Sequence, residues 1–464
     1  MIYRDHKVEE LKIAYIGGGS RGWAWGLMSD LASASDISGQ VFLYDIDFEA
    51  AKANEIIGNK FNDAEGAKSV WGYKAVETIG EALTGADFVI ISILPGTFDE
   101  MESDVHTPEK YGIYQTVGDT TGPGGVVRAM RCLPMFEEIG EAIKTYCPKA
   151  WVINYTNPMT LCIKTLYRVF PEIRAWGCCH EVFGTQKLLV KLVEETFGVK
   201  DVNRAEIKVN PVSVNHFTWL TKATWRNMDL FPYYKEFCLR HPEGVFGDGP
   251  VDDNWMNNVF SSKEMVKMEL FLRYGVIAAA GDRHLAEFLE GKWYLESPER
   301  AWEMMFKLTP VSWRKEDLKN RLARSARLVS GEEQPKLTPT GEEGVTQIRA
   351  LLGLTEIVTN VNIPNRGQIP NLPLGAVVET NAVFRDGDLN PVFAGPVPES
   401  IYPMVARACG QQESLSEGIA NRDVEKIFQV FVNDPLVTCG YHDARKLFDE
   451  MCQNTGKYLT MYEL

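Results

Sequence analysis

Residues 12–22 read Lys-Ile-Ala-Tyr-Ile-Gly-Gly-Gly-Ser-Arg-Gly, an apolar run that passes directly into a G-x-G-x-x-G loop. Such a loop turns a short strand sharply into a helix, and its backbone amides can approach a pyrophosphate at the positive end of that helix. The residues predicted to form the phosphate cradle are Gly17, Gly19, Ser20, Arg21 and Gly22. The stretch therefore predicts a dinucleotide site.

A second apolar strand, 41–44, ends at Asp45, about twenty residues beyond the loop. A carboxylate at this position meets the ribose hydroxyls of NAD and disfavours the extra phosphate of NADP. A glycine-rich turn that binds nothing is the alternative, but the preceding strand, the helix-like segment and the acid together argue against it. We therefore expect NAD as the cofactor.

Short apolar segments alternate with helical ones through the first half of the chain. The predicted strands are 12–16, 41–44, 88–93, 151–155 and 173–178, and one clear helix has apolar residues at three- and four-residue spacing between Val126 and Ile143. This alternation predicts an α/β fold with a parallel sheet. Ligands bind such sheets at the carboxyl ends of the strands, where the sequence places Asp45, Pro95, Asn157, Cys179 and His180.

The second half has a mixed pattern. We expect a strand over 207–220, helix over 261–290, a surface or disordered loop over 330–344, strands over 367–383 and helix over 398–434. The predicted organisation is a Rossmann-like NAD-binding domain over 1–200 and a mixed α+β substrate domain over 201–464.

Composition excludes several kinds of partner. The chain has 464 residues and a net charge of −15, with 48 basic and 63 acidic residues and no basic run, so nucleic acid is not expected. The longest apolar runs, such as 88–94, are far short of the ~20 residues that span a bilayer. Nine cysteines without small-domain spacing do not form a disulfide framework. We expect a cytoplasmic protein without a membrane partner.

Cys179 and His216 are a soft and a borderline metal ligand that lie near predicted strand ends. They are a plausible pair for a divalent ion whose coordination substrate oxygens complete. A buried thiol and a structural imidazole are the alternative. Asn157 precedes a proline, so it is either a turn residue or a polar contact to a ligand.

Five further motifs follow the loop in a fixed order: G-D-T-T-G-P-G-G at 118–125, N-P at 157–158, C-H-E-V at 179–182, V-N-H-F at 214–217 and G-D at 281–282. In this order they resemble glycoside hydrolase family four, NAD- and divalent-metal-dependent glycosidases with a lactate/malate dehydrogenase-like fold. The resemblance covers nearly the whole chain. C-H-E-V is similar to the α-galacturonidase branch, whereas relatives that act on phosphorylated sugars carry C-N-x-P or C-D-M-P, and α-glucosidase relatives C-H-G or C-H-S.

The resemblance assigns roles to individual residues. It implies Cys179 and His216 as ligands of Mn²⁺, Asp282 as the base, and His180 as either the proton donor to the leaving oxygen or a positioning residue. It implies Asn157 as a contact to substrate hydroxyls. Asp119 is a further predicted polar contact, and its alternative is a helix cap; for Asp282 the alternative is a helix-end aspartate.

A galacturonide carries a carboxylate, which a pocket in a protein of −15 net charge must meet with cations or strong donors. Arg283 and His284, next to Asp282, are the predicted contacts, with Arg128 and Arg131 behind them. The alternative is a solvated helix face with ordinary ion pairs.

The resemblance also implies a reaction outside the two-carboxylate scheme of most glycosidases. NAD⁺ takes a hydride from carbon 3 of the sugar, a base removes the proton on carbon 2, the aglycone leaves, water adds and the hydride returns. Within the same family, an α-glucosidase or 6-phospho-glycosidase is the alternative. From other classes, the alternatives are a malate-type 2-hydroxyacid dehydrogenase and a regulator that senses NAD. Because proteins of this fold superfamily assemble as oligomers, the resemblance also implies a homodimer or homotetramer.

Overall fold

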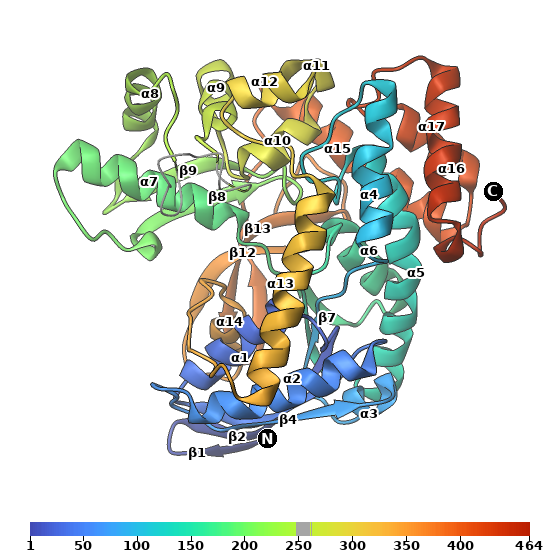
Figure 1. Cartoon of the computed structure of the whole chain (residues 1–464). Helices are drawn as coiled ribbons and strands as arrows, with labels where there is room; N and C mark the ends of the chain where they lie inside the picture. Colours follow the sequence, from blue (N-terminus) through green and yellow to red (C-terminus); the bar gives the residue numbers. More distant parts are fainter. Residues whose placement is uncertain (247–259, 261) are drawn as a thin grey trace.

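The structure is a computed structural model that describes residues 1–246, 260 and 262–464 (Figure 1). Its largest element is a ten-stranded sheet with the order β14-β13-β12-β7-β6-β5-β2-β3-β4, and β1 pairs with β2. The parallel strands are β2 (Lys7–Ile16), β3 (Ile37–Tyr44), β4 (Trp71–Val76), β5 (Phe88–Ile91), β6 (Trp151–Asn154) and β7 (Arg174–Gly177). The α/β class with a parallel sheet is confirmed.

The central strands are apolar on both sides because helices cover both faces of the sheet. Along β2, Ile13 and Tyr15 pack in the core beneath α1 (Trp23–Ser33), α2 (Phe48–Lys60) and α14 (Gly344–Leu351). The alternate residues Ala14 and Ile16 pack in the core of α5 (Gly122–Tyr146) and α6 (Met159–Val169). This two-residue alternation places a large core on each face of the sheet.

The second half of the chain supplies three strands of the same sheet. These are β12 (Ile357–Pro364), β13 (Val377–Arg385) and β14 (Asp388–Pro391), all antiparallel to their neighbours. β12 joins β7 through the pair Asn362 and Gly177. The predicted strand region 367–383 overlaps only β13, because residues 365–376 form a connection. Strand β4 was not predicted from the sequence.

A smaller sheet forms the upper part in Figure 1. It contains β8 (Ile207–Val212), β9 (Trp219–Trp225), β10 (Met228–Asp229) and β11 (Ile277–Ala278), with α7 (Glu181–Phe197), α8 (Phe231–Arg240) and α9 (Met265–Tyr274) beside it. The strand expected over 207–220 is therefore interrupted by a loop at 213–218. The helix expected over 261–290 is wrong as one element, because α9, β11 and α10 (Asp282–Phe288) divide it, and residue 261 lies outside the described residues.

The remaining helices connect the two parts. α13 (Val311–Ser330) runs in front of the sheet from the upper to the lower part (Figure 1). α4 (Phe98–His106), α15 (Tyr402–Ala420), α16 (Val424–Val432) and α17 (Tyr441–Asn454) lie beside α5 or α6, near the C-terminus. Shorter elements are β1 (Ile2–Arg4), α3 (Ile79–Leu83), α11 (Gly291–Tyr294) and α12 (Pro298–Glu303). No described helix has the length and apolar character that a membrane crossing requires.

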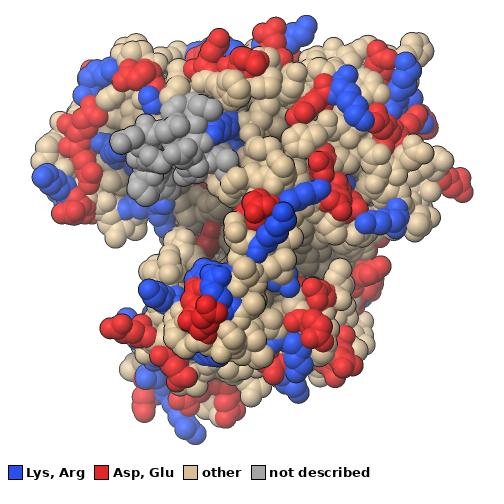
Figure 2. Space-filling view, in the orientation of Figure 1, with Lys and Arg blue, Asp and Glu red and all other residues tan. Residues whose placement is uncertain are grey.

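The loop expected over 330–344 holds specific contacts. The backbone N–H of Thr338 donates to Ser29 Oγ at 2.7 Å, and that of Thr340 donates to Asp30 Oδ1 at 3.2 Å, so the loop is fastened to α1. Figure 2 shows an indentation between the part that carries α7 to α9 and the part that carries α1, α2 and α14. Acidic and basic side chains alternate over this face without a large patch of one sign.

Candidate active site

The predicted phosphate cradle lies between β2 and α1 at the carboxyl edge of the sheet. A Cβ on Gly18 would lie 2.7 Å from Leu43 Cβ, and one on Gly19 would lie 2.6 Å from Ala50 Cβ, so the loop requires glycine at both positions. Helix α1 begins after Gly22 with no side chain bonded to its first amides. An uncapped helix N-terminus beside a glycine loop fits a bound phosphate.

The cradle is ordered from within. Asn54 Nδ2 donates to the carbonyl oxygens of Gly18 at 2.7 Å and Ser20 at 3.0 Å, and its Oδ1 accepts from Trp25 Nε1 at 2.8 Å. Asp45 Oδ2 accepts the Gly19 N–H at 2.9 Å. The predicted ribose carboxylate therefore lies beside the loop and also helps to hold it.

Two more predicted cofactor residues lie at this edge. Arg21 Nη2 is 3.8 Å from Asp47 Oδ2, so its side chain extends along the start of α2. The Pro95 carbonyl oxygen accepts from Arg131 Nε at 3.3 Å. The guanidinium of Arg131 also forms two hydrogen bonds with Asp104, at 2.9 and 2.5 Å. The buried Arg131 side chain therefore joins Pro95 to Asp104. Because it is paired, it is not the free cation that the sequence predicts behind the substrate site.

Asp119, His216 and His284 lie close together. Their potential ligand atoms all lie within 4.8 Å of one another, and the two imidazole centroids are 3.7 Å apart. They come from the loop before α5, the loop between β8 and β9, and the first turn of α10. One carboxylate and two imidazoles suit a divalent transition ion such as Mn²⁺ or Zn²⁺. We call these three residues the ligand group.

The charges within the ligand group favour metal binding. Burial and the nearby His284 lower the pKa of His216 to about 4, so its ring is neutral at pH 7. Thr120 Oγ1 lies 2.9 Å from His216 Nδ1 and leaves Nε2 for a ligand. Burial opposes ionisation of Asp119, but His216, His284 and Arg128 hold the pKa of its carboxyl well below its usual range. The group thus offers one anion and neutral imidazole nitrogen.

Cys179 is buried just beyond β7 and is not part of this ligand group. Its carbonyl oxygen accepts from Asn360 Nδ2 at 3.0 Å. Burial raises the pKa of the thiol, so the metal-free protein holds it protonated. The role of Cys179 as a metal ligand stays a prediction.

Glu181 lies between two histidines. Its Oε2 accepts the Gly281 N–H at 2.7 Å, while Oε1 is 3.7 Å from His284 Nε2 and 3.9 Å from His180 Nε2. Although burial opposes ionisation, His284 and His180 lower the pKa of Glu181 to about 2. His180 Nδ1 lies 2.9 Å from Glu342 Oε1, and this hydrogen bond raises the pKa of the half-exposed ring to about 9. His180 is therefore protonated at neutral pH.

Asp282 faces away from the ligand group. Its two carboxylate oxygens accept the N–H groups of Val266 and Lys267, each at 3.0 Å, at the start of α9, and the residue is fully buried. Burial raises the pKa of its carboxyl to about 7. These contacts are those of a helix-capping aspartate. Its role as the base stays a prediction, and no described contact joins it to the group.

Asn157 lies beside the ligand group. Its Nδ2 donates to Asp119 Oδ2 at 3.1 Å, and its carbonyl oxygen accepts from Arg128 Nε at 3.1 Å. Its buried Oδ1 has no partner among the described residues. A buried amide oxygen without a donor fits a hydroxyl of a bound ligand.

The two residues predicted to bind the substrate carboxylate, Arg283 and His284, have different surroundings in the structure. His284 belongs to the ligand group, whereas Arg283 Nη2 donates to the Thr116 carbonyl oxygen at 2.8 Å and also to Thr309 Oγ1. Glu287, one turn further along α10, accepts the N–H groups of Thr116, Val117 and Gly118 at 2.7 to 3.0 Å. Helix α10 thus fixes the loop that carries Asp119.

Sequence reasoning missed several residues that build this site, among them Thr120 as a partner of His216, Glu287 and Glu342. Glu287 left one sequence signal, because it interrupts the apolar run Leu-Ala-Glu-Phe-Leu at 285–289. An isolated carboxylate in such a run must find buried donors. Contacts between distant segments, such as His180 with Glu342, leave no signal in a single sequence.

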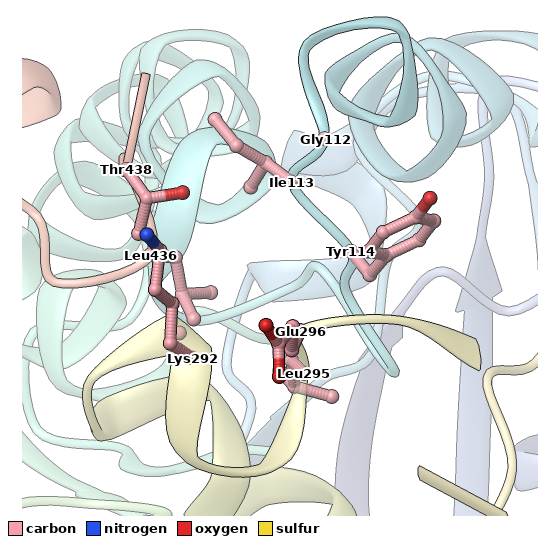
Figure 3. Close-up of a pocket in the computed structure, with 9 residues that line it drawn as sticks. Gly112, Ile113, Tyr114, Lys292, Leu295, Glu296, Leu436 and Thr438 are labelled. Carbon is pink, nitrogen blue, oxygen red and sulfur yellow. The ribbon is translucent and has the colours of Figure 1, made fainter. Parts of the chain in front are cut away.

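Two cavities lie outside the ligand group. The one in Figure 3 has a volume of about 50 Å³, is lined by 112–114, Leu295 and Leu436, and contains none of the predicted site residues. A volume of this order suits a few waters rather than a sugar. The other, about 310 Å³, is lined by Gly22, Trp23, Tyr155, Arg321 and Glu342, so it adjoins both the cradle and the partner of His180.

A parallel sheet with a G-x-G-x-x-G loop at its edge, next to a two-histidine and one-carboxylate group, defines a dinucleotide-dependent class of enzyme. The family model described as Family 4 glycosyl hydrolase matches residues 12–195, and that of the Family 4 glycosyl hydrolase C-terminal domain matches 212–437. This chain belongs to glycoside hydrolase family 4.

Individual relatives agree with this assignment. A protein named alpha-galacturonidase from Thermoanaerobacterium saccharolyticum is 60% identical over 464 residues, which is 100% of both chains. A crystal structure from Bacillus subtilis, described provisionally as a glucosidase, is 50% identical with a TM-score of 0.90, and the match covers 96% of this chain and 100% of that one. The 6-phospho-beta-glucosidase of Thermotoga maritima, solved with manganese and NAD⁺, shares the fold at 20% identity and a TM-score of 0.75, over 97% and 99% of the two chains.

Proposed function

We propose that this protein is an α-galacturonidase that hydrolyses α-linked galacturonides with NAD⁺ and a divalent cation, Mn²⁺ in the first instance. The observation that carries the proposal is identity of 60% along the entire length of a relative with that name, together with the C-H-E-V motif at 179–182. Identity at this level leaves the architecture of the substrate site little room to differ.

The residues present fit both cofactors. The glycine cradle and the uncapped start of α1 suit a pyrophosphate, and the ligand group suits a divalent ion, with Cys179 and His216 as the pair that the family assigns. When bound, NAD⁺ supplies reversible hydride acceptance at carbon 3 and the cation supplies positive charge to oxygens on carbons 2 and 3.

The protein's own side chains supply binding and proton movement. Asn157 Oδ1 is available to accept from a sugar hydroxyl beside Asp119. His180, protonated at neutral pH, can donate to the leaving oxygen, and Glu181 stabilises its charge from 3.9 Å. Glu342 limits the movement of the His180 ring, so His180 acts from a fixed position.

The substrate is tested with four aryl glycosides side by side: the α-galacturonide, the α-galactoside, the α-glucoside and a 6-phosphorylated α-glucoside. With NAD⁺, Mn²⁺ and reductant present, the galacturonide should be hydrolysed ~10³-fold or more faster than the others, because unpaired pocket cations cost several kcal/mol. Comparable rates on a neutral or phosphorylated sugar would contradict the proposed substrate and leave the family intact.

The same assay separates the enzyme classes. Phenol release should require NAD⁺ and the cation, and NADH should not accumulate because the hydride returns to the sugar. A malate-type dehydrogenase would accumulate NADH, and a nucleotide sensor would turn nothing over. In deuterated water the sugar product should carry deuterium at carbon 2, and a product without it would exclude proton abstraction there.

We further propose a cytoplasmic homodimer or homotetramer. All nine cysteines lie in the described part of the chain and are free, which suits a reducing compartment. A reducing compartment would also protect a metal-binding thiol at Cys179. Equilibrium sedimentation of the purified chain measures the subunit number.

A further inference from the structure

Arg314, in the first turns of α13, has no ion pair or hydrogen bond with any described residue. No described carboxylate lies within ion-pairing distance of its guanidinium, and no described acceptor bonds it, although the side chain is half-buried. The other arginines on α13 differ. Arg321 bonds Asp317 at 2.6 Å, Arg324 bonds Glu333 at 2.8 Å and Arg327 bonds Glu333 at 3.1 Å.

Arg314 points toward the candidate active site. Its Cζ lies 5.7 Å from the ring centroid of Phe260, and the Cζ of Arg283 lies 5.1 Å from the same ring, so the two guanidinium groups flank one aromatic side chain. After burial, the charges that act most on Arg314 are those of Asp119 in the ligand group and Arg128. The charge of Arg314 thus acts on the loop before α5.

The other arginines near the site already have partners. Arg131 is paired with Asp104, Arg283 is held by Thr116 and Thr309, and Arg128 uses Nε on the Asn157 carbonyl oxygen. Of the described arginines near the site, Arg314 alone has its whole planar fork of donors available.

A partly buried guanidinium beside other cations is costly unless an anion joins it. A carboxylate matches the guanidinium fork with two parallel hydrogen bonds, which a neutral hydroxymethyl group cannot make.

We propose that Arg314 binds the carboxylate of the galacturonide, with Arg128 and Arg283 adding charge from behind, and that this contact sets the preference for uronic acids over neutral sugars. The inference rests on the proposed function and adds the residue that recognises the acid group. Helix α13 thereby becomes a wall of the substrate site, beside the indentation seen in Figure 2.

The test compares Arg314→Gln and Arg314→Lys with wild type in the full-length protein loaded with NAD⁺ and Mn²⁺. The matched control is Arg324→Gln on the same helix, whose side chain pairs with Glu333. kcat/KM is measured on the aryl α-galacturonide and the aryl α-galactoside, and the Kd of free D-galacturonate is measured by calorimetry as a readout independent of turnover.

Arg314→Gln should lower kcat/KM on the galacturonide ~10²-fold or more, because a charge-assisted bidentate contact is lost, and leave the galactoside rate within ~3-fold. The Kd of D-galacturonate should rise at least ~10-fold, with a smaller rise for Arg314→Lys, which keeps the charge and loses the fork. Arg324→Gln should match wild type.

Three outcomes would overturn the inference. Unchanged galacturonate affinity in Arg314→Gln, or an equal loss on both substrates, shows that Arg314 does not read the carboxylate while the galacturonidase proposal stands. A wild-type enzyme that prefers the galactoside removes the proposed function itself, and the inference with it.

Discussion

His216 shows how a single residue depends on its surroundings. It has a φ of 64°, in the left-handed region, within a turn in which the Phe217 N–H bonds the Val214 carbonyl oxygen at 3.1 Å. The sequence predicted this histidine within a strand, whereas the structure places it in the loop between β8 and β9. The strain is tolerated because the turn delivers the ring to the ligand group, where Thr120 fixes its orientation.

Replacement of the imidazoles should remove the cation. His216→Ala and His284→Ala should each weaken Mn²⁺ binding by ~10²-fold or more, because each removes a ligand atom from a three-residue group. Electron paramagnetic resonance of the free ion measures the affinity. His241→Ala, whose ring pairs with exposed Glu195, is the matched control.

Cys179→Ser tests the remaining metal assignment. We expect it to abolish hydrolysis and leave NAD⁺ affinity within ~3-fold, because no described contact joins Cys179 to the glycine loop and a serine hydroxyl is a poor ligand for the ion. If this variant binds Mn²⁺ as wild type does and keeps its activity, the carboxylate and the imidazoles suffice and the thiol is a core residue.

Asp282→Asn separates a base from a helix cap. If Asp282 is the base, Asp282→Asn should slow turnover and deuterium exchange at carbon 2 together, by ~10²-fold or more. If Asp282 is only a helix cap, the substitution should lower the free energy of unfolding by ~1 kcal/mol, because the amide retains one acceptor for the two N–H groups of α9. Deuterium exchange per folded molecule would then stay near wild type. Chemical denaturation and the isotope assay on one preparation distinguish the two roles.

Elements with a strong local pattern were predictable, and elements set by distant contacts were not. The glycine loop, strands β2, β3, β5, β6 and β7, and helix α5 follow from apolar runs and their spacing. Strand β4 carries Gly72 and Lys74 in six residues, so its pattern is weak. The helical pattern over 265–288 hid β11, because a two-residue strand is fixed only by its pairing with Trp219 and Leu220.

Gly19→Ala should damage the loop between β2 and α1. The new Cβ would lie 2.6 Å from Ala50 Cβ and 2.9 Å from Asp45 Oδ2, so the loop must move and the Asp45 contact weaken. We expect a loss of ~1–3 kcal/mol in unfolding free energy and at least ~10-fold in NAD⁺ affinity. Gly410→Ala, at an exposed position of α15 where a Cβ meets nothing within 4 Å, is the control and should be neutral or slightly stabilising. Fluorescence titration with NAD⁺ measures the affinity, and an unchanged value would show that the backbone here does not contact the nucleotide.

At the scale of the whole molecule, the fold class could be predicted from the sequence, but the connectivity of the strands could be predicted less well. The parallel sheet follows from the alternation of segments, and the residues that follow its strands lie at one edge as the rule for such sheets requires. The return of β12, β13 and β14 to the same sheet was not foreseen, because strand pairing across nearly two hundred residues has no local signature. The ligand group likewise joins residues 119, 216 and 284, which only the tertiary fold brings together.

Because β12, β13 and β14 join the sheet of the first half, the predicted division into domains 1–200 and 201–464 can be examined. In the folded chain, Trp176 on β7 is fully buried, its Nε1 donates to Gln347 Oε1 at 2.7 Å and its ring meets Phe384 on β13 at 5.2 Å. Separation at residue 200 would expose this tryptophan and leave β7 as an unpaired, apolar edge, which promotes aggregation. The two parts therefore share one core in the region of β7.

We accordingly expect a fragment of residues 1–200 to fail to fold alone, although it contains the entire glycine loop and all the parallel strands. Circular dichroism and dye binding should show a loosely packed or aggregated chain without NAD⁺ affinity, while the full chain unfolds in one calorimetric transition. A fragment that melts cooperatively and binds NAD⁺ would establish residues 1–200 as an independent domain, and the contacts of Trp176 would then be an interface between two domains and not a shared core.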